Sequence, residues 1–160
     1  MPRALFEKTG NAVYISHLDL MRLFQRAFKR ADLPLTHTKG FNPRPSVSIA
    51  LPLSVGVESR CELLDFELES FDATCDDICD KLNEGLVEGV RVLDVYKGGK
   101  KIRDLCYLRC ELVLEYDKGV ADGCIGALQT LFAGECIIVP KKTKNGIQDQ
   151  NIASMIKEIF

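Results

Sequence analysis

The stretch SHLDLMRLFQRAFKRA, residues 16–31, decides the fold class, because it reads as an amphipathic helix with a marked beginning. Ser16 and Asp19 have the spacing of a capping box, in which the serine accepts a hydrogen bond from a first-turn amide and the acidic residue reaches back. Apolar residues then recur every 3.6 residues or so, which predicts a buried face of Leu20, Leu23, Phe24, Ala27 and Phe28. The exposed face would carry Asp19, Arg22, Arg26, Lys29 and Arg30. Pro34 is expected to end the helix.

Segments with the period of strands flank this helix. Residues 3–15 contain a Thr-Gly-Asn break and predict a kinked strand or a short hairpin, and residues 46–51 and 64–69 alternate as strands with one apolar face. Residues 72–86 predict a second helix, and residues 90–96 a further strand. The order β-α-β-β-α-β predicts an α+β fold of the ferredoxin-like type over residues 1–98, with two helices on one face of a four-stranded antiparallel sheet.

A second, incomplete ferredoxin-like α+β unit is predicted over residues 102–160, after a Gly-Gly-Lys-Lys linker. Its long first strand would place one apolar side inward: Leu108, Cys110, Leu112, Leu114 and Tyr116. A helix with Ala121, Cys124, Leu128 and Leu131 inward, a short strand at 136–139 and a basic turn at 141–146 would follow. The apolar residues of 151–160 have no visible cover, so we expect a unit truncated at its C-terminal end or covered by a partner.

Composition indicates a soluble, cytoplasmic protein. The chain has 160 residues, of which 46% are hydrophobic, so it can bury a core, and no run approaches the ~18 apolar residues of a membrane span. Seven cysteines are an odd number, which favours reduced thiols over a disulfide framework. The net charge of −2 conceals an asymmetry, because residues 1–60 hold nine Lys/Arg against four Asp/Glu. A polyanion would therefore meet the first third of the chain.

Two cysteine pairs raise the question of a metal or iron–sulfur site. Cys75 and Cys79 share the apolar stripe of the second predicted helix, while Cys106 and Cys110 share the apolar side of the predicted strand at 108–116. All four are therefore interpreted as small buried apolar residues, and no third cysteine completes a cluster motif. The sequence predicts no metal site and no cofactor.

The most function-like segment is the basic loop HTKGFNPRP, residues 37–45. Gly40 permits close backbone approach, Phe41 offers a ring for stacking, Asn42 can read a base edge, and prolines stiffen the presentation of Arg44. A stiff basic loop beside a basic helix is typical of single-stranded RNA recognition. The alternative is a structural crossover loop in which Phe41 plugs the core.

Two histidines allow a catalytic alternative. His17 follows the predicted helix cap, where backbone amides favour a neutral ring that suits a general base, although a capping or packing role is the commoner fate of such a histidine. With His37 and Lys39 it could imitate a metal-independent endoribonuclease of ferredoxin-like fold. The chain otherwise holds no complete catalytic or cluster-binding motif, which favours an accessory role over catalysis.

Residues 14–68 resemble the bacterial radical SAM-linked protein family, whose members are encoded beside, or fused to, a radical SAM protein with a cobalamin-binding-type domain. The specific pieces are SHLDLMR at 16–22, GFNP at 40–43 and PLSVGVES at 52–59. The resemblance implies a radical SAM protein as partner and no established reaction.

Together these features predict a non-catalytic accessory that recognises RNA for a radical SAM enzyme involved in RNA modification. The predicted contact residues are His17, Arg22, Arg26, Lys39, Gly40, Phe41, Asn42 and Arg44. The catalytic alternative would use His17, His37 and Lys39. A third hypothesis is a protein-interaction module that docks on the radical SAM partner. The RNA hypothesis assumes that His17 and Arg44 line one groove.

Overall fold

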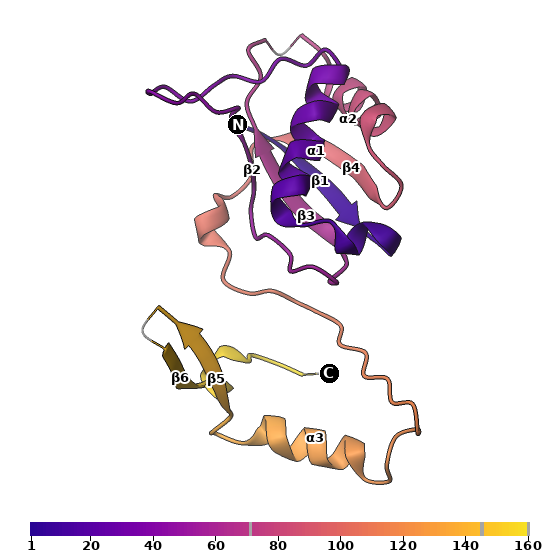
Figure 1. The fold of residues 1–160 in the computed structure, drawn as a ribbon, viewed down its shortest axis with the longest axis vertical. Coiled ribbons are helices and arrows are strands. Elements are labelled where there is room, and N and C mark those ends of the chain that lie inside the picture. Colours follow the sequence, from indigo (N-terminus) through magenta and orange to yellow (C-terminus); the bar gives the residue numbers. More distant parts are fainter. Residues whose placement is uncertain (71, 145, 160) are drawn as a thin grey trace. The chain divides into compact units, whose positions relative to one another are not determined.

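The structure, a computed structural model, describes residues 1–70, 72–144 and 146–159. It divides into two units, Met1–Tyr107 and Leu108–Phe160 (Figure 1). The described residues form three α-helices and two antiparallel sheets, which confirms the predicted α+β class. Asn145 of the predicted basic turn and Phe160 of the predicted C-terminal apolar stretch lie outside the described residues.

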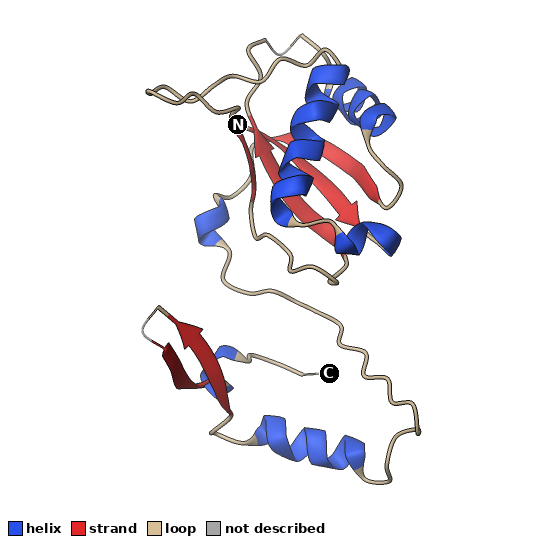
Figure 2. Cartoon of the chain, viewed as in Figure 1, coloured by secondary structure: helices blue, strands red, loops and turns tan. Residues whose placement is uncertain are grey.

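The first unit forms one four-stranded antiparallel sheet with two helices packed on it. Its elements are β1 (Pro2–Lys8), the short 3-10 helix η1 (Gly10–Tyr14), α1 (His17–Arg30), β2 (Val47–Ile49), β3 (Ser59–Phe66), α2 (Cys75–Gly85), β4 (Val90–Lys97) and η2 (Ile102–Asp104). The strands lie in the order β2-β3-β1-β4 (Figure 2). The edge strands are therefore β2 and β4.

A single apolar cluster joins both helices to one face of this sheet. The ring of Phe6 on β1 meets Phe24 on α1 at a centroid distance of 4.8 Å, and Phe28 meets Phe66 on β3 at 4.9 Å. The predicted buried face of α1 is confirmed, with Leu23 partly rather than fully buried. The alternate side chains of each strand point to the other face of the sheet, which the two helices do not cover.

Hydrogen bonds at both ends of α1 explain where this helix begins and ends. Ser16 accepts from the amide of Asp19 at 3.2 Å, but the Asp19 carboxylate accepts from the Ser16 hydroxyl instead of its amide, so the predicted box is one-sided. α1 ends before Pro34, because Asp32 adopts a left-handed φ of 53° and the Leu33 amide donates to the Phe28 carbonyl at 3.0 Å. This is the hydrogen-bond pattern of a Schellman motif, so the backbone terminates the helix without the proline.

Two local predictions for this unit are corrected. Residues after the Thr9 break form η1 and no second hairpin strand. β2 ends at Ile49, so Leu51 is exposed and does not extend the apolar face.

The segment before β4 crosses close to η1, where the Thr9 amide donates to the Gly89 carbonyl at 2.7 Å. Gly89 has φ +84°, and a Cβ there would lie 2.4 Å from the Thr9 oxygen, so the crossing requires glycine.

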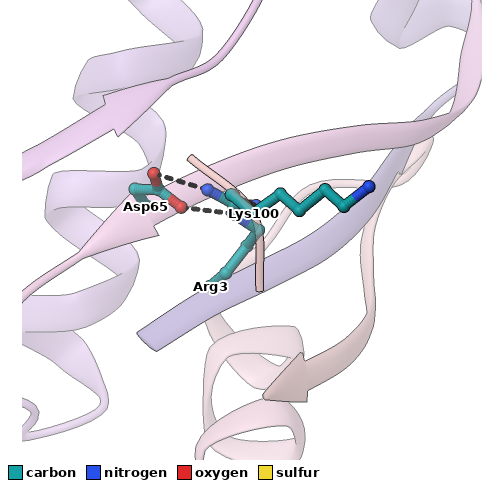
Figure 3. A network of polar contacts seen from close by, with 3 residues as sticks. All are labelled: Arg3, Asp65 and Lys100. Atoms are coloured by element: carbon teal, nitrogen blue, oxygen red, sulfur yellow. Dashed lines mark hydrogen bonds and ion pairs between the residues drawn. The ribbon is translucent and has the colours of Figure 1, made fainter. Parts of the chain in front are cut away.

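The open face of the sheet carries a nearly buried ion pair (Figure 3). Arg3 on β1 donates to both oxygens of Asp65 on β3, at 2.5 and 3.0 Å, and its remaining Nη1 donates to the Lys100 carbonyl at 3.0 Å. The hydrogen bond to Asp65 raises the pKa of Arg3. This network fastens the segment after β4 to the sheet.

The second unit contains α3 (Cys124–Ala133), β5 (Ile138–Thr143), β6 (Gly146–Asn151) and η3 (Ala153–Met155), with β5 and β6 paired. The strand predicted at 108–116 is wrong, because these residues adopt no strand and Leu108 and Leu112 are exposed. A segment in which apolar and polar residues alternate forms a strand only where a neighbouring strand supplies backbone hydrogen bonds. The strand predicted at 136–139 begins instead at Ile138 and runs into the predicted turn. On α3, Cys124 and Leu128 are partly buried and Leu131 is exposed. Ala121, which was predicted to lie on the helix, precedes it and is exposed.

The prediction that four cysteines are buried holds for one pair and is wrong for the other. Cys75 and Cys79 pack against the core as predicted, whereas Cys106 and Cys110 are exposed, because the strand that would have buried them is absent. All seven cysteines are free. Among the described residues, no group of three His, Cys, Asp or Glu side chains could hold a metal ion.

No helix in the described part of the chain has the length and apolar character needed to span a bilayer.

Candidate nucleic-acid interface

Residues 36–46 form a hydrogen-bonded projection, here called the arm, at one end of the first sheet (Figure 1). At its base the Thr36 amide donates to the Glu67 carbonyl at 2.9 Å, and the Ser46 amide donates to the Thr36 carbonyl at 2.7 Å. Further out the Thr38 amide donates to the Arg44 carbonyl at 2.8 Å, and the Arg44 amide donates to the Thr38 hydroxyl at 3.0 Å. The arm therefore has a ladder of its own, anchored just beyond β3.

The tip of the arm presents an aromatic ring to solvent. Phe41 has a relative exposure of 109%, so the alternative in which it plugs the core is wrong. Lys39, Gly40, Asn42 and Arg44 are exposed as well. The arm thus displays a ring between two cations on a short hydrogen-bonded stem.

The exposed face of α1 carries the predicted cations, but two of them already interact with other residues of the chain. Arg22 pairs with Asp19 at 2.9 Å, and Arg30 donates to the Gly85 carbonyl at the end of α2 at 3.4 Å. A hydrogen bond from the Ser16 hydroxyl, together with Arg22, lowers the pKa of Asp19. For Arg26 the described residues supply no hydrogen bond or ion pair, so it is the guanidinium most available to a ligand.

A depression of about 360 Å³ adjoins this face. Its lining is Ile15, Asp19, Arg22, Leu23, Arg26 and Val87. The sequence reasoning found Arg22 and Arg26 but missed the apolar members of this site. Val87 lies after α2, about sixty residues from α1 in the chain, so no local pattern could place it here.

His17 and the arm lie at opposite ends of the first unit. His17 opens α1, whose 14 residues span roughly 20 Å, and α1 begins after the C-terminal end of β1. The arm is anchored beyond Phe66 at the end of β3, and β3 pairs antiparallel with β1 so that this end meets the start of β1. The structure therefore does not bring His17 together with Arg44, nor with His37 and Lys39. The single groove that the RNA hypothesis assumed is wrong, and His17 does not belong to the surface of the arm. Within the described residues, the buried Nδ1 of His17 has no hydrogen-bond partner.

The comparisons with known proteins place the chain in a family. A family model described as "Uncharacterized protein conserved in bacteria (DUF2344)" matches residues 2–160. No curated protein and no solved structure matches the chain. The family description names no radical SAM protein, so that association stays a prediction. Because the match covers all but the first residue, the chain belongs to the DUF2344 family of uncharacterized proteins conserved in bacteria.

Proposed function

We propose that this protein binds single-stranded RNA through the arm, as a recognition accessory of a radical SAM enzyme. The observation that carries the proposal is the fully exposed ring of Phe41 between Lys39 and Arg44. A base can stack on such a ring, which contributes about 1–3 kcal/mol per base, while the flanking cations contact phosphates. The excess of Lys/Arg in residues 1–60 supports the choice of a polyanion over a neutral ligand.

The fold supports this choice by analogy. We assign the first unit to the ferredoxin-like type, because its helices and strands alternate in the expected order and its sheet has the order β2-β3-β1-β4 with every pair antiparallel. The RNA-recognition modules built on four-stranded sheets bind single strands by stacking bases on aromatic rings. For the second unit, an incomplete ferredoxin-like assignment rests on the sequence pattern alone.

The radical SAM partner rests on the resemblance carried by residues 16–22, 40–43 and 52–59. The nuclease alternative is less well supported, because His17 lies a helix length from His37 and Lys39. Protein docking remains a rival, since an exposed Phe41 would also suit a protein surface.

Fluorescence anisotropy with a labelled twelve-residue oligouridine tests RNA binding. We expect Phe41→Ala to weaken binding about tenfold, since one stacking contact is lost, and Arg44→Gln to lower both the affinity and its salt dependence. Tyr116→Ala and Arg60→Gln are matched controls, because both side chains are exposed outside the arm.

Binding that ignores salt, or arm variants that behave like their controls, would remove the RNA proposal. Co-purification with the radical SAM protein distinguishes the rival. A complex that resists ribonuclease, is lost in Phe41→Ala and forms without any RNA affinity would identify the arm as a protein-docking element.

A further inference from the structure

The depression beside α1 combines two kinds of surface. Ile15 and Leu23 are partly buried and pack against the core, and Val87 is 46% exposed, so together they form an apolar floor. Arg22 and Arg26 stand on successive turns of α1 at its rim, where side chains four residues apart are neighbours. The depression is shallow and open to solvent, with a volume of about 360 Å³.

The charges at the rim are arranged to receive an anion. Asp19 holds Arg22 at 2.9 Å and is itself held by the Ser16 hydroxyl at 2.8 Å, so this carboxylate orients one guanidinium. Arg26 makes no hydrogen bond or close ion pair with a described residue, and its charge acts on Asp19 only from a longer distance. With one carboxylate against two guanidinium groups, the lining carries one net positive charge. A guanidinium fork matches phosphate oxygens, and the free Arg26 can supply it.

We propose that this depression is a second binding site, which takes one nucleotide with its phosphate on Arg22 and Arg26 and its base against Ile15, Leu23 and Val87. The inference rests on the proposed RNA function and extends it to a surface that contains no residue of the arm. The nucleotide can come from a bound RNA strand or from a free nucleoside monophosphate, because both present the same base and phosphate. The source that fits the proposed function is the bound RNA strand.

A strand that reaches both surfaces must be long enough. The arm follows α1, whereas Ile15 precedes it, so a bridging strand covers a good part of the roughly 20 Å of the helix. Stacked nucleotides rise about 3.4 Å each, so a trinucleotide spans about 10 Å and a dodecamer about 40 Å. A dodecamer is thus longer than α1, whereas a trinucleotide has about half its length, so we expect U12 to engage both surfaces and U3 to engage one of them.

The test uses the full chain and anisotropy with labelled U3 and U12. We expect Arg26→Gln and Val87→Asp each to weaken U12 binding about tenfold, and Arg26→Gln to reduce the salt slope by about one. Arg60→Gln and Val55→Asp are matched controls at exposed positions outside the depression, and circular dichroism verifies that every variant is folded. In wild-type protein labelled with ¹⁵N, U12 and, more weakly, uridine monophosphate are expected to shift the amides of Ile15, Leu23 and Val87.

The outcomes separate the two proposals. If wild-type protein binds U12 and Phe41→Ala weakens it, while Arg26→Gln and Val87→Asp match their controls, the arm proposal stands and the nucleotide site is refuted. If wild-type protein does not bind U12, but uridine monophosphate shifts those amides in wild type and not in Arg26→Gln, the depression takes a free nucleotide and the strand source is refuted. If neither ligand has any effect, both proposals fall.

Discussion

Arg3 and Asp65 form an ion pair whose side chains are only 11% and 15% exposed. Such a pair contributes little when intact relative to apolar packing, but removal of one partner leaves the other charge without compensation in a poorly hydrated place. Neither residue was singled out from the sequence. They lie 62 positions apart, and only the register of β1 against β3 brings them opposite each other.

Asp65→Asn is therefore expected to lower the free energy of unfolding by about 2–4 kcal/mol, because Arg3 stays buried without its counter-charge. Urea unfolding followed by circular dichroism measures the change. Asp104→Asn is the control, since the Arg103–Asp104 pair is long, at 4.0 Å, and exposed, and its loss is expected to be within about 0.5 kcal/mol. Equal effects of the two substitutions would contradict the role given to Arg3.

The edge strand β4 is completed by a side chain of α2. The Asn83 amide donates to the Val92 carbonyl at 2.9 Å, and its oxygen accepts from the Val92 amide at 2.8 Å, so one side chain satisfies both backbone groups. An edge strand otherwise offers such groups to other chains. The contact links α2 to β4 through two hydrogen bonds, the number that a pair of residues can exchange between antiparallel strands.

Asn83→Ala is expected to lower the free energy of unfolding by about 1–3 kcal/mol, since two backbone groups lose their partner. The Val92 amide should also exchange with deuterium faster, which mass spectrometry or NMR detects. Glu84→Ala, at an exposed position of the same helix, serves as the control. An unchanged exchange rate at Val92 would show that water replaces Asn83 without loss.

Helix α1 was predictable because its serine cap and its 3.6-residue apolar period lie in one stretch of sequence, and α2 was predictable from its apolar stripe. The predicted end signal of α1, Pro34, was wrong, because a backbone motif ends the helix before it. The arm was predictable as a loop, but the exposure of Phe41 was not, because a hydrophobic residue in a loop fits either the core or the solvent. The depression could not be predicted at all, since Val87 reaches Leu23 only through the packing of α2 beside α1.

At the scale of the whole chain, the two units differ in how much they bury. Eighteen buried apolar residues form the core cluster of the first unit, whereas Ile137 is the buried apolar residue of the second unit's described part. Both units have similar apolar patterns in sequence, so the sequence alone overestimated the number of buried residues in the second unit. Residues 108–116 show why: their alternation fits a strand, but no described strand pairs with them.

Hydrogen–deuterium exchange of the full chain is expected to follow this difference. Amides of β1 and β3 should be protected for the longest time, because opening them requires the first unit to unfold. Amides of residues 108–116 should exchange within the shortest labelling time. Strong protection of 108–116 in the isolated chain would show that these residues form the strand that their alternation suggests.

Gly89 constrains how two segments of the first unit can meet. Every other amino acid adds at least one carbon atom at a point that lies 2.4 Å from the Thr9 carbonyl oxygen, so a substitution at this position would push the two segments apart. One of these segments carries Val87 and the other leads to Ile15. Gly89 therefore helps to set the shape of the depression without lining it, because its carbonyl accepts from the Thr9 amide and its missing side chain leaves room for the Thr9 carbonyl.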